Sequence, residues 1–131
     1  MLFRSCADFR VAERLVDLNP IARRLAGTHW PGALTIVAPI KKRARLSHLL
    51  DQGSGYLGVR VPDSEVCVSL AGKVGGSITG TSANLSGQPS CRTAAQVAGS
   101  LDGRIQLVID GGELRGKSRP SSRSQEALSR F

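Results

Sequence analysis

The sequence predicts a single α/β domain, and three observations support this prediction. Short apolar runs rich in β-branched residues are bounded by Gly, Pro and Asp, which is typical of strands. Segments with apolar residues at helical spacing lie between these runs. The chain has 131 residues, enough to bury one hydrophobic core. Because strands and helices alternate, we expect helices to cover much of the sheet.

The first elements are expected to be two helices and a strand. Residues 6–18 place their apolar side chains on one side of a helix. A second helix is expected to start at Asn19-Pro20, because Asn is a good cap and Pro fits the first helical position, and to stop at Gly27. Residues 33–38 form an apolar run interrupted only by a threonine, and this run predicts the first strand.

The later elements continue the alternation. Residues 56–61 predict a second strand, and either Asp63 or Ser64 is expected to cap the helix that follows it. The remaining expected elements are a strand over residues 75–79, a helix over 93–101 and a last strand over 105–109.

Composition and charge exclude several classes of protein. The sequence has no apolar run near the length of a membrane-spanning helix, and its first residues do not form a secretory signal, so we expect a cytoplasmic protein. Three separated cysteines and two histidines predict reduced thiols and no zinc site. The formal net charge is +8, and the densest group of basic residues is Lys-Lys-Arg-Ala-Arg at 41–45. This group could attract tRNA or nucleotide phosphate, or it could simply form a solvated turn.

The segment from Gly80 to Ser90 has the composition of a ligand-binding loop. It carries hydroxyl and amide side chains and no charge, so it could offer neutral donors to a phosphate or carboxylate. The same residue types also dominate ordinary turns. On an extended backbone, Ser82 and Asn84 point to one face. Ser90 could contribute to the same site or cap the next helix.

Arg60 is the best single candidate for a binding residue. It is the only charged residue in an otherwise apolar strand, and an unpaired buried charge is costly, so its guanidinium needs an anion. The planar guanidinium suits a carboxylate or a phosphate held by two hydrogen bonds. The alternative is a structural salt bridge to Asp63 or Asp110.

Two further segments are interpreted as mainly structural. Trp30-Pro31-Gly32 is expected to act in packing and turning before it acts in chemistry, and His29 is a weaker candidate base. Asp110 is expected to orient the turn at the following Gly-Gly, with Mg²⁺ placement as the alternative.

Four segments together resemble the YrdC-like family, whose typical members are threonylcarbamoyl-adenylate synthases. The segments occur in the family's order and at its spacings. They are Thr-His-Trp-Pro-Gly-Ala-Leu-Thr at 28–35, Leu-Gly-Val-Arg-Val-Pro-Asp at 57–63, the loop at 80–90, and Leu-Val-Ile-Asp-Gly-Gly at 107–112.

The resemblance implies a fold and a set of site residues. The fold would be a twisted mixed sheet whose concave face holds the active site. Arg60 would meet the carboxylate of threonine, with substrate contacts also from Thr81 and Ser82. Nucleotide contacts would come from Ser82, Asn84, Ser90 and Tyr56. Tyr56 could equally be a packing residue. No residue is assigned as catalytic and none as a metal ligand.

The resemblance also implies a reaction. L-threonine, bicarbonate or CO2, and ATP with its Mg²⁺ would give threonylcarbamoyl-AMP and pyrophosphate. The product would serve threonylcarbamoyladenosine formation next to the anticodon of tRNA. Positioning and charge neutralisation would supply most of the rate.

The chain also departs from the family pattern at both ends. The family's Pro-Thr-Asp-Thr-like strand, its Lys-x-Arg-like motif and its Ser-Thr-Val-Val-like strand have no counterpart, although Ser118 is a weak match to the family serine. We therefore expect a partial domain over residues 1–112 and a basic, poorly ordered Ser/Arg-rich tail over 113–131. A homodimer or a partner in a tRNA-modification complex could complete the site.

These departures leave alternatives to full synthase activity. The chain could be an inactive truncated isoform, or a nucleotide- or RNA-binding module of the same fold that catalyses nothing. A carbamoyl-transferring domain of a hydrogenase-maturation protein is disfavoured, because zinc-finger and acylphosphatase segments are missing. Threonine dependence of turnover separates the synthase from the other interpretations.

Overall fold

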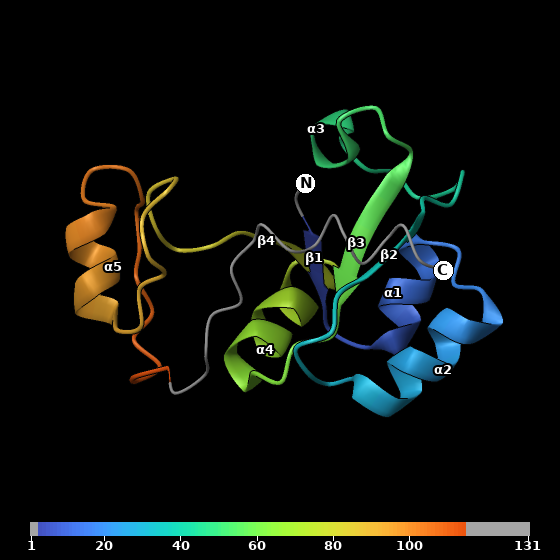
Figure 1. Ribbon diagram of the computed structural model, residues 1–131, viewed down its shortest axis with the longest axis horizontal. Helices are drawn as coiled ribbons and strands as arrows, with labels where there is room; N and C mark the ends of the chain where they lie inside the picture. The colour runs from blue at the N-terminus through green and yellow to red at the C-terminus, as the bar shows by residue number, and fades with distance from the viewer. Residues whose placement is uncertain (1–2, 115–131) are drawn as a thin grey trace. The chain divides into compact units, whose positions relative to one another are not determined.

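The computed structural model describes residues 3–114, which fall into two compact units divided after Thr81. The first unit contains four strands and four helices (Figure 1). In chain order they are β1 (Phe3–Cys6), α1 (Phe9–Leu15), α2 (Pro20–His29), β2 (Ile36–Pro39), α3 (His48–Asp51), β3 (Tyr56–Arg60), α4 (Glu65–Lys73) and β4 (Ser77–Gly80). The second unit contains the helix α5 (Ala94–Ser100).

The strands of the first unit form one mixed sheet in the order β2-β3-β1-β4. The central strands β1 and β3 are parallel, and Phe3 lies opposite Gly58. The outer strands β2 and β4 run antiparallel to their neighbours. Pro39 is accommodated because β2 is an edge strand, where a missing N–H breaks no ladder. The predicted α/β class and mixed sheet are confirmed.

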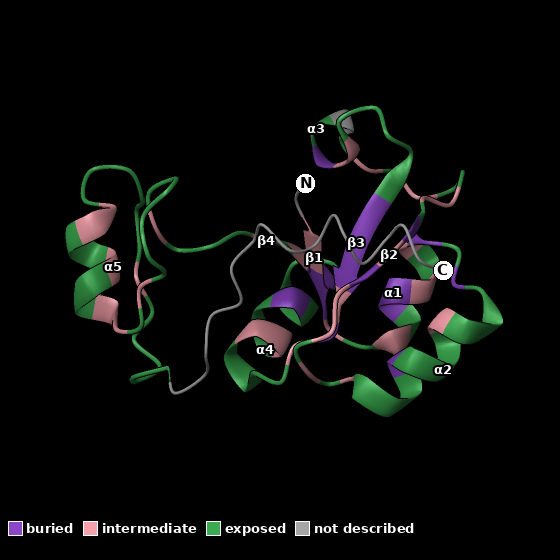
Figure 2. Cartoon of the chain, in the orientation of Figure 1, coloured by how far each residue is buried: buried purple, intermediate pink, exposed green. Residues whose placement is uncertain are grey.

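One face of this sheet carries the hydrophobic core. Side chains alternate along a strand, so Leu57 and Val59 of β3 point to the same face, and both are fully buried. Cys6 of β1 joins them, together with Val11 of α1 and Ala26 of α2. Figure 2 shows β3 as the most continuously buried strand. The opposite face is therefore free to carry Gly58 and Arg60.

Side-chain caps fix where the helices begin. In each of three cases a side-chain oxygen accepts a hydrogen bond from the backbone N–H three residues later, as expected for an N-cap. The pairs are Asp8 with Val11, Asn19 with Ala22, and Ser64 with Cys67. The predicted start at Asn19-Pro20 is confirmed, and Ser64 rather than Asp63 caps α4.

The beginning of the chain differs from the prediction of a helix over residues 6–18. Residues Phe3–Cys6 form β1, and α1 covers only Phe9–Leu15. The backbone of β1 pairs with β3 on one side and β4 on the other, so distant partners satisfy its hydrogen bonds. Local periodicity contains no information about such partners.

The end of α2 and the start of β2 also differ from the prediction. The helix α2 continues through Gly27 to His29, and the Trp30 N–H donates to the Ala26 carbonyl at 2.9 Å. The first predicted strand starts at Ile36 instead of residue 33, because its pairing with β3 begins opposite Val59. The short helix α3 was not predicted.

The third predicted strand, over residues 75–79, starts later than expected and ends one residue beyond. It is present as β4, Ser77–Gly80. Gly75 and Gly76 have φ angles of +95° and +102°, so they form the turn before the strand instead of its first residues.

The second unit is described over residues 82–114. Its helix α5 is capped by Thr93, whose side chain accepts from the Gln96 N–H. No residue of 82–114 is buried (Figure 2). The predicted strand over 105–109 is absent, because no other described segment pairs with it, and Leu107 is 76% exposed. Most of the predicted tail, residues 115–131 with Ser118, lies outside the described residues.

Candidate functional site

Arg60 ends β3 on the sheet face opposite the core. Tyr56, Gly58 and Arg60 alternate with the buried Leu57 and Val59, so the first three share one face. The guanidinium of Arg60 therefore lies on the face of the sheet that the hydrophobic core does not cover. Burial lowers the pKa of Arg60, yet an arginine stays charged at any physiological pH.

Two side chains, Phe3 from the neighbouring strand β1 and Thr35 from the residue just before β2, hold the guanidinium of Arg60. Its Nε and Nη2 atoms donate to the Thr35 hydroxyl oxygen at 3.0 and 2.7 Å. Its central carbon lies 4.9 Å from the centroid of the Phe3 ring, which is a cation–π contact. A guanidinium has five N–H donors, and Thr35 occupies two of them. The others have no hydrogen-bond partner among residues 3–81.

Within residues 3–81 Arg60 forms no salt bridge, so the alternative of a structural pair with Asp63 is wrong. The ion pair found there joins Arg23 to Glu13, far from β3 in sequence. The Asp110 carboxylate instead accepts a hydrogen bond from the Gly112 N–H at 2.9 Å, which confirms its predicted role in orienting that turn. A half-buried cation without a carboxylate partner can bind an anionic ligand.

Two glycines make room for the Phe3 ring beneath Arg60. A Cβ atom on Gly80 would lie 2.5 Å from the Cε2 and Cζ atoms of Phe3. A Cβ atom on Gly58 would lie 3.1 Å from the Phe3 Cβ and 3.2 Å from the Thr35 Cγ2. Any side chain at these positions would displace the groups that hold Arg60.

Two other predicted site residues belong to the first unit. Tyr56 is half exposed at the opposite end of β3, and four residues of a strand span about 13 Å. The structure therefore does not bring Tyr56 next to Arg60. Thr81 follows directly after β4, next to the Gly80 that faces Phe3, and it is exposed.

The remaining predicted residues lie in the second unit. Ser82 and Ser90 are exposed. The Asn84 side-chain NH2 donates to the carbonyls of Leu85 and Gln88, each at 2.9 Å, so Asn84 shapes its own loop. Its Oδ1 is buried and has no hydrogen-bond partner among the described residues. The alternative role of Ser90 as a helix cap is wrong, because Thr93 caps α5.

The structural interpretation of the Trp30 segment is confirmed. The Trp30 indole N–H donates to the Leu34 carbonyl at 2.8 Å, and its ring packs 6.2 Å from the Phe9 ring. The Gly32 N–H donates to the Val61 carbonyl at 2.9 Å, which ties the turn to the end of β3. This segment positions Thr35 for its contact with Arg60.

Sequence reasoning missed Thr35 and Phe3 as the partners of Arg60. Thr35 had a recognisable signal, since it is the one polar residue in the apolar run at 33–38. Phe3 had none, because its contact depends on the parallel pairing of β1 with β3.

Metal-binding residues do not gather in the part of the chain that the structure describes. Residues 3–114 contain no group of three His, Cys, Asp or Glu side chains placed to hold a metal ion. Cys6 is buried, while Cys67 and Cys91 are partly buried, and all three are free thiols. Nor is any helix within residues 3–114 long and apolar enough to cross a membrane.

Comparison with known proteins identifies the family. The model for the Sua5, YciO and YrdC proteins, described as "Telomere recombination", matches residues 2–122. The chain belongs to this family. Threonylcarbamoyl-AMP synthase of Bacillus subtilis is 43% identical over 107 residues, covering 81% of this chain and 31% of that protein. Threonylcarbamoyl-AMP synthase of Vibrio vulnificus is 36% identical over 119 residues, covering 88% of this chain and 62% of that protein.

Solved structures of the family share the fold. Pyrococcus abyssi Sua5 complexed with L-threonine superposes with a TM-score of 0.79 at 36% identity, covering 87% of this chain and 33% of that one. Escherichia coli YciO gives a TM-score of 0.77 at 24% identity, covering 86% of this chain and 55% of that one, and supports the fold alone. The chain thus spans between about a third and three-fifths of the length of these relatives.

Proposed function

We propose that this chain acts in threonylcarbamoyl-AMP synthesis, joining L-threonine, bicarbonate or CO2, and ATP with release of pyrophosphate. The observation that carries the proposal is the half-buried guanidinium of Arg60, which Thr35 and Phe3 hold in place and which has no carboxylate partner among residues 3–81. Relatives named threonylcarbamoyl-AMP synthase support it. The product would serve modification of tRNA next to the anticodon, in the cytoplasm.

Arg60 would bind the carboxylate of L-threonine. Its remaining N–H donors suit the two oxygens of a carboxylate, and a charge-assisted pair is stronger in a half-buried site than in water. The complex of Pyrococcus abyssi Sua5 with L-threonine supports an amino-acid ligand. Thr81 and Ser82 remain proposed further contacts to this substrate.

The reaction needs positioning more than covalent work by the protein. The threonine amine would add to CO2 to form a carbamate and lose one proton, and a carbamate oxygen would then attack the α-phosphorus of ATP. The bond from that phosphorus to the bridging oxygen breaks, and pyrophosphate leaves. Arg60 would hold the carboxylate of threonine and thereby orient the carbamate at the amine end toward the α-phosphorus. This orientation would increase the rate. No side chain is proposed as an acid or base.

Nucleotide binding is proposed for Ser82, Asn84, Ser90 and Tyr56. The unpartnered Asn84 Oδ1 is an acceptor, so its natural ligand is a ribose hydroxyl or a base N–H and not a phosphate oxygen. The described residues offer no metal cluster, so Mg²⁺ would arrive with the triphosphate as part of the substrate.

The second candidate is binding without turnover. The proposed nucleotide residues Ser82, Asn84 and Ser90 lie in a unit that has no buried residue over 82–114. A loop without a packed support is less preorganised, which lowers the rate that positioning can supply. This observation favours a chain that binds threonine or nucleotide and turns over slowly or not at all.

Pyrophosphate release tests the proposal. We would measure it with ATP and bicarbonate, with and without L-threonine, for the wild type, for Arg60→Ala and for Arg24→Ala, a matched loss of an exposed arginine. Threonine-dependent release that Arg60→Ala abolishes and Arg24→Ala preserves is the expected result. Release that is independent of threonine, or equal in both variants, would overturn the proposal.

Thermal shift with L-threonine separates binding from turnover. A ligand that binds only the folded chain raises its unfolding temperature as its concentration exceeds the dissociation constant. A shift that Arg60→Ala removes, in the absence of any pyrophosphate release, would identify the non-catalytic alternative.

A further inference from the structure

A small pocket at the carboxyl ends of β1 and β3 is not used by the proposed function. It has a volume of about 310 Å³, at the lower end of the range for small-molecule sites. Ala7 and Asp8, which follow β1, and Val61, which follows β3, all line it. Val61 belongs to the hydrophobic core, so this pocket lies on the core face of the sheet, whereas Arg60 lies on the other face. We name it the Trp30 pocket.

Two aromatic rings and small aliphatic side chains form the walls of the Trp30 pocket. The rings belong to Phe9 and Trp30, whose centroids are 6.2 Å apart and whose planes are tilted by 58°. The Trp30 indole N–H donates to the Leu34 carbonyl at 2.8 Å, which fixes the orientation of the larger ring. Ala26 and Val61, which are both buried, contribute the aliphatic surface. These walls are therefore in place before a ligand binds.

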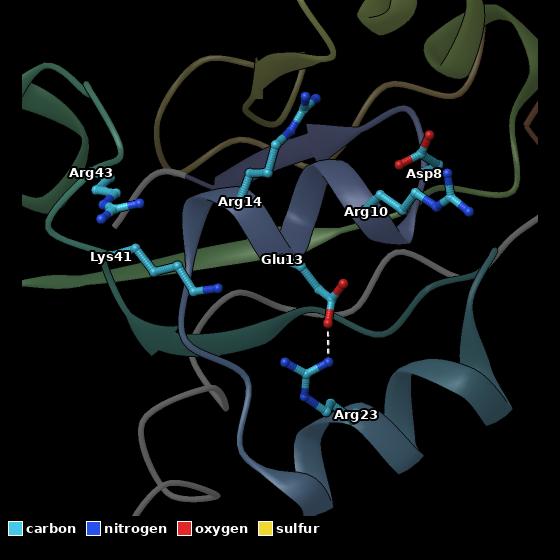
Figure 3. A pocket seen from close by; sticks show the side chains of 7 residues that line it. All are labelled: Asp8, Arg10, Glu13, Arg14, Arg23, Lys41 and Arg43. Carbon is cyan, nitrogen blue, oxygen red and sulfur yellow. Dashed lines mark hydrogen bonds and ion pairs between the residues drawn. The ribbon is translucent and has the colours of Figure 1, made fainter.

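Among residues 3–81, Asp8 is the only charged residue that lines the Trp30 pocket. Its Oδ1 atom caps α1 by accepting from the Val11 N–H at 2.8 Å. Its Oδ2 atom has no hydrogen-bond or ion-pair partner within the same residues. Arg10 lies beside Asp8 in Figure 3, but no ion pair joins the two, and Lys41 and Arg43 lie toward the other end of α1. One carboxylate oxygen is thus free to attract a cation.

The carboxyl end of α2 adds partial negative charge at the Trp30 pocket. In a continued helix the carbonyl of Gly27, a lining residue, would accept from the N–H of residue 31, but Pro31 has no N–H. The Thr28 carbonyl would accept from Gly32, whose N–H donates instead to the Val61 carbonyl at 2.9 Å. Both carbonyls are left without a helical partner, and this end of a helix attracts cations.

We propose that the Trp30 pocket binds a small quaternary ammonium compound. A quaternary ammonium has no N–H groups to satisfy, and aromatic faces attract its charge. A primary ammonium is strongly hydrated and would leave hydrogen bonds unmade against these apolar walls. An anion would be repelled by Asp8 and by the carboxyl end of α2. The volume of about 310 Å³ suits a free compound and not a segment of a larger partner.

Choline and neohexyl alcohol test the proposal, because they have the same shape and carbon replaces the charged nitrogen in the alcohol. Trp30 is the only tryptophan of the chain, so its fluorescence reports on this pocket. We expect choline to bind at least about tenfold more tightly than the alcohol, a difference of about 1.4 kcal/mol. Cation–π contacts that are partly removed from water supply a preference of this size. Titration calorimetry gives the two affinities independently of the fluorescence.

Asp8→Asn removes the charge and keeps the helix cap, because Asn and Asp cap helices equally well. Asp17→Asn is the matched control, since Asp17 is an exposed acid that does not line the pocket. We expect choline affinity to fall about fivefold in Asp8→Asn and less than about twofold in the control. Affinity for the alcohol should be the same in both variants. Circular dichroism checks that each variant is folded.

Phe9→Leu tests the aromatic wall separately from the charge. The substitution removes one of the two rings and keeps an apolar side chain. We expect choline affinity to fall about threefold and the affinity for neohexyl alcohol to stay the same, because only the cation depends on a ring face. An equal loss for both ligands would show that Phe9 contributes packing alone and would overturn the aromatic part of the proposal.

Four other results would overturn the proposal as a whole. They are equal affinities for choline and neohexyl alcohol, equal losses in Asp8→Asn and Asp17→Asn, no response to choline in fluorescence or calorimetry, and tighter binding of a trimethyl-lysine peptide than of choline. The last result would assign the pocket to a protein partner. None of these measurements depends on pyrophosphate release, and Asp8→Asn should keep its thermal shift with L-threonine. The proposal therefore stands or fails separately from the synthase.

Discussion

Gly58→Ala would place a methyl group between the two side chains that hold Arg60. The new Cβ would lie 3.1 Å from the Phe3 Cβ and 3.2 Å from the Thr35 Cγ2. Optimal separations between carbon atoms are about 3.5–4.0 Å, so both neighbours must move by a few tenths of an ångström. The Phe3 Cβ is fixed to the backbone of β1, which pairs with Gly58, so it cannot rotate away. The strain therefore passes to the sheet or to Thr35.

The expected cost follows from the contacts. Adding a methyl group to a packed site costs about 1–3 kcal/mol of unfolding free energy. For a unit of this size, 1 kcal/mol corresponds to about 4–8 °C, so the unfolding temperature should fall by about 4–24 °C. Because Thr35 and Phe3 both contact the guanidinium, L-threonine affinity at Arg60 should fall as well.

The assay combines thermal unfolding by circular dichroism with titration calorimetry of L-threonine. Gly72→Ala in α4 is the matched control, because no atom lies within 4 Å of its ideal Cβ. Alanine is favoured over glycine inside a helix by about 0.5–1 kcal/mol, so this variant should be slightly more stable than the wild type.

Two results would refute the reasoning. A Gly58→Ala chain that unfolds at the wild-type temperature would show that no steric conflict exists. A destabilised chain that binds L-threonine as the wild type does would show that Arg60 does not depend on its two neighbours.

Three further predictions follow from single contacts. Thr35→Val removes the hydroxyl acceptor for Arg60 at nearly constant shape, and should cost about 1–3 kcal/mol in urea unfolding, whereas Thr35→Ser should be milder. Asn19→Ala removes the cap of α2 and should cost about 1 kcal/mol by the same measurement, and equal stability of Asn19→Ala and Asn19→Ser would contradict this. Burial raises the pKa of the Cys6 thiol from 9.0 to about 11, so the folded chain holds this proton more tightly than the unfolded chain. The resulting stabilisation is complete below pH 9.0 and is lost as the pH rises to about 11, so unfolding free energies at stepped pH should decline there for the wild type and less for Cys6→Ala.

Local sequence signals predicted the elements whose ends are fixed locally. The start of α2 at Asn19-Pro20 and the strand that carries Arg60 depend on neighbouring residues, and both were predicted. The cap of α4 required a choice between Asp63 and Ser64 that only hydrogen-bond geometry decides.

Non-local pairing explains the failures. The strand β1 exists because β3 and β4 flank it, and residues 105–109 are not a strand because no described segment pairs with them. A strand-like sequence indicates that a segment can pair, and the partner decides whether it does.

In the candidate site, too, local signals could be predicted from the sequence and non-local contacts could not. Arg60 could be identified from one charge in an apolar strand, but its partners are Phe3 in the neighbouring strand β1 and Thr35 just before β2. Likewise, residues 41–45 were recognised as basic, whereas the backbone bonds that tie this segment to the end of α1 could not be predicted locally.

The setting of Arg60 predicts what this cation can recognise. Arg60 is half-buried and held by two side chains, so its pairing with a carboxylate is weakly screened by salt and is selective in geometry. Arg43 and Arg45, in contrast, are exposed to solvent, so their attraction for any anion is strongly screened by salt. L-threonine affinity, measured by titration calorimetry, should therefore change little between low and high salt. A steep loss of L-threonine affinity with rising salt would mean that exposed cations, and not Arg60, hold the carboxylate.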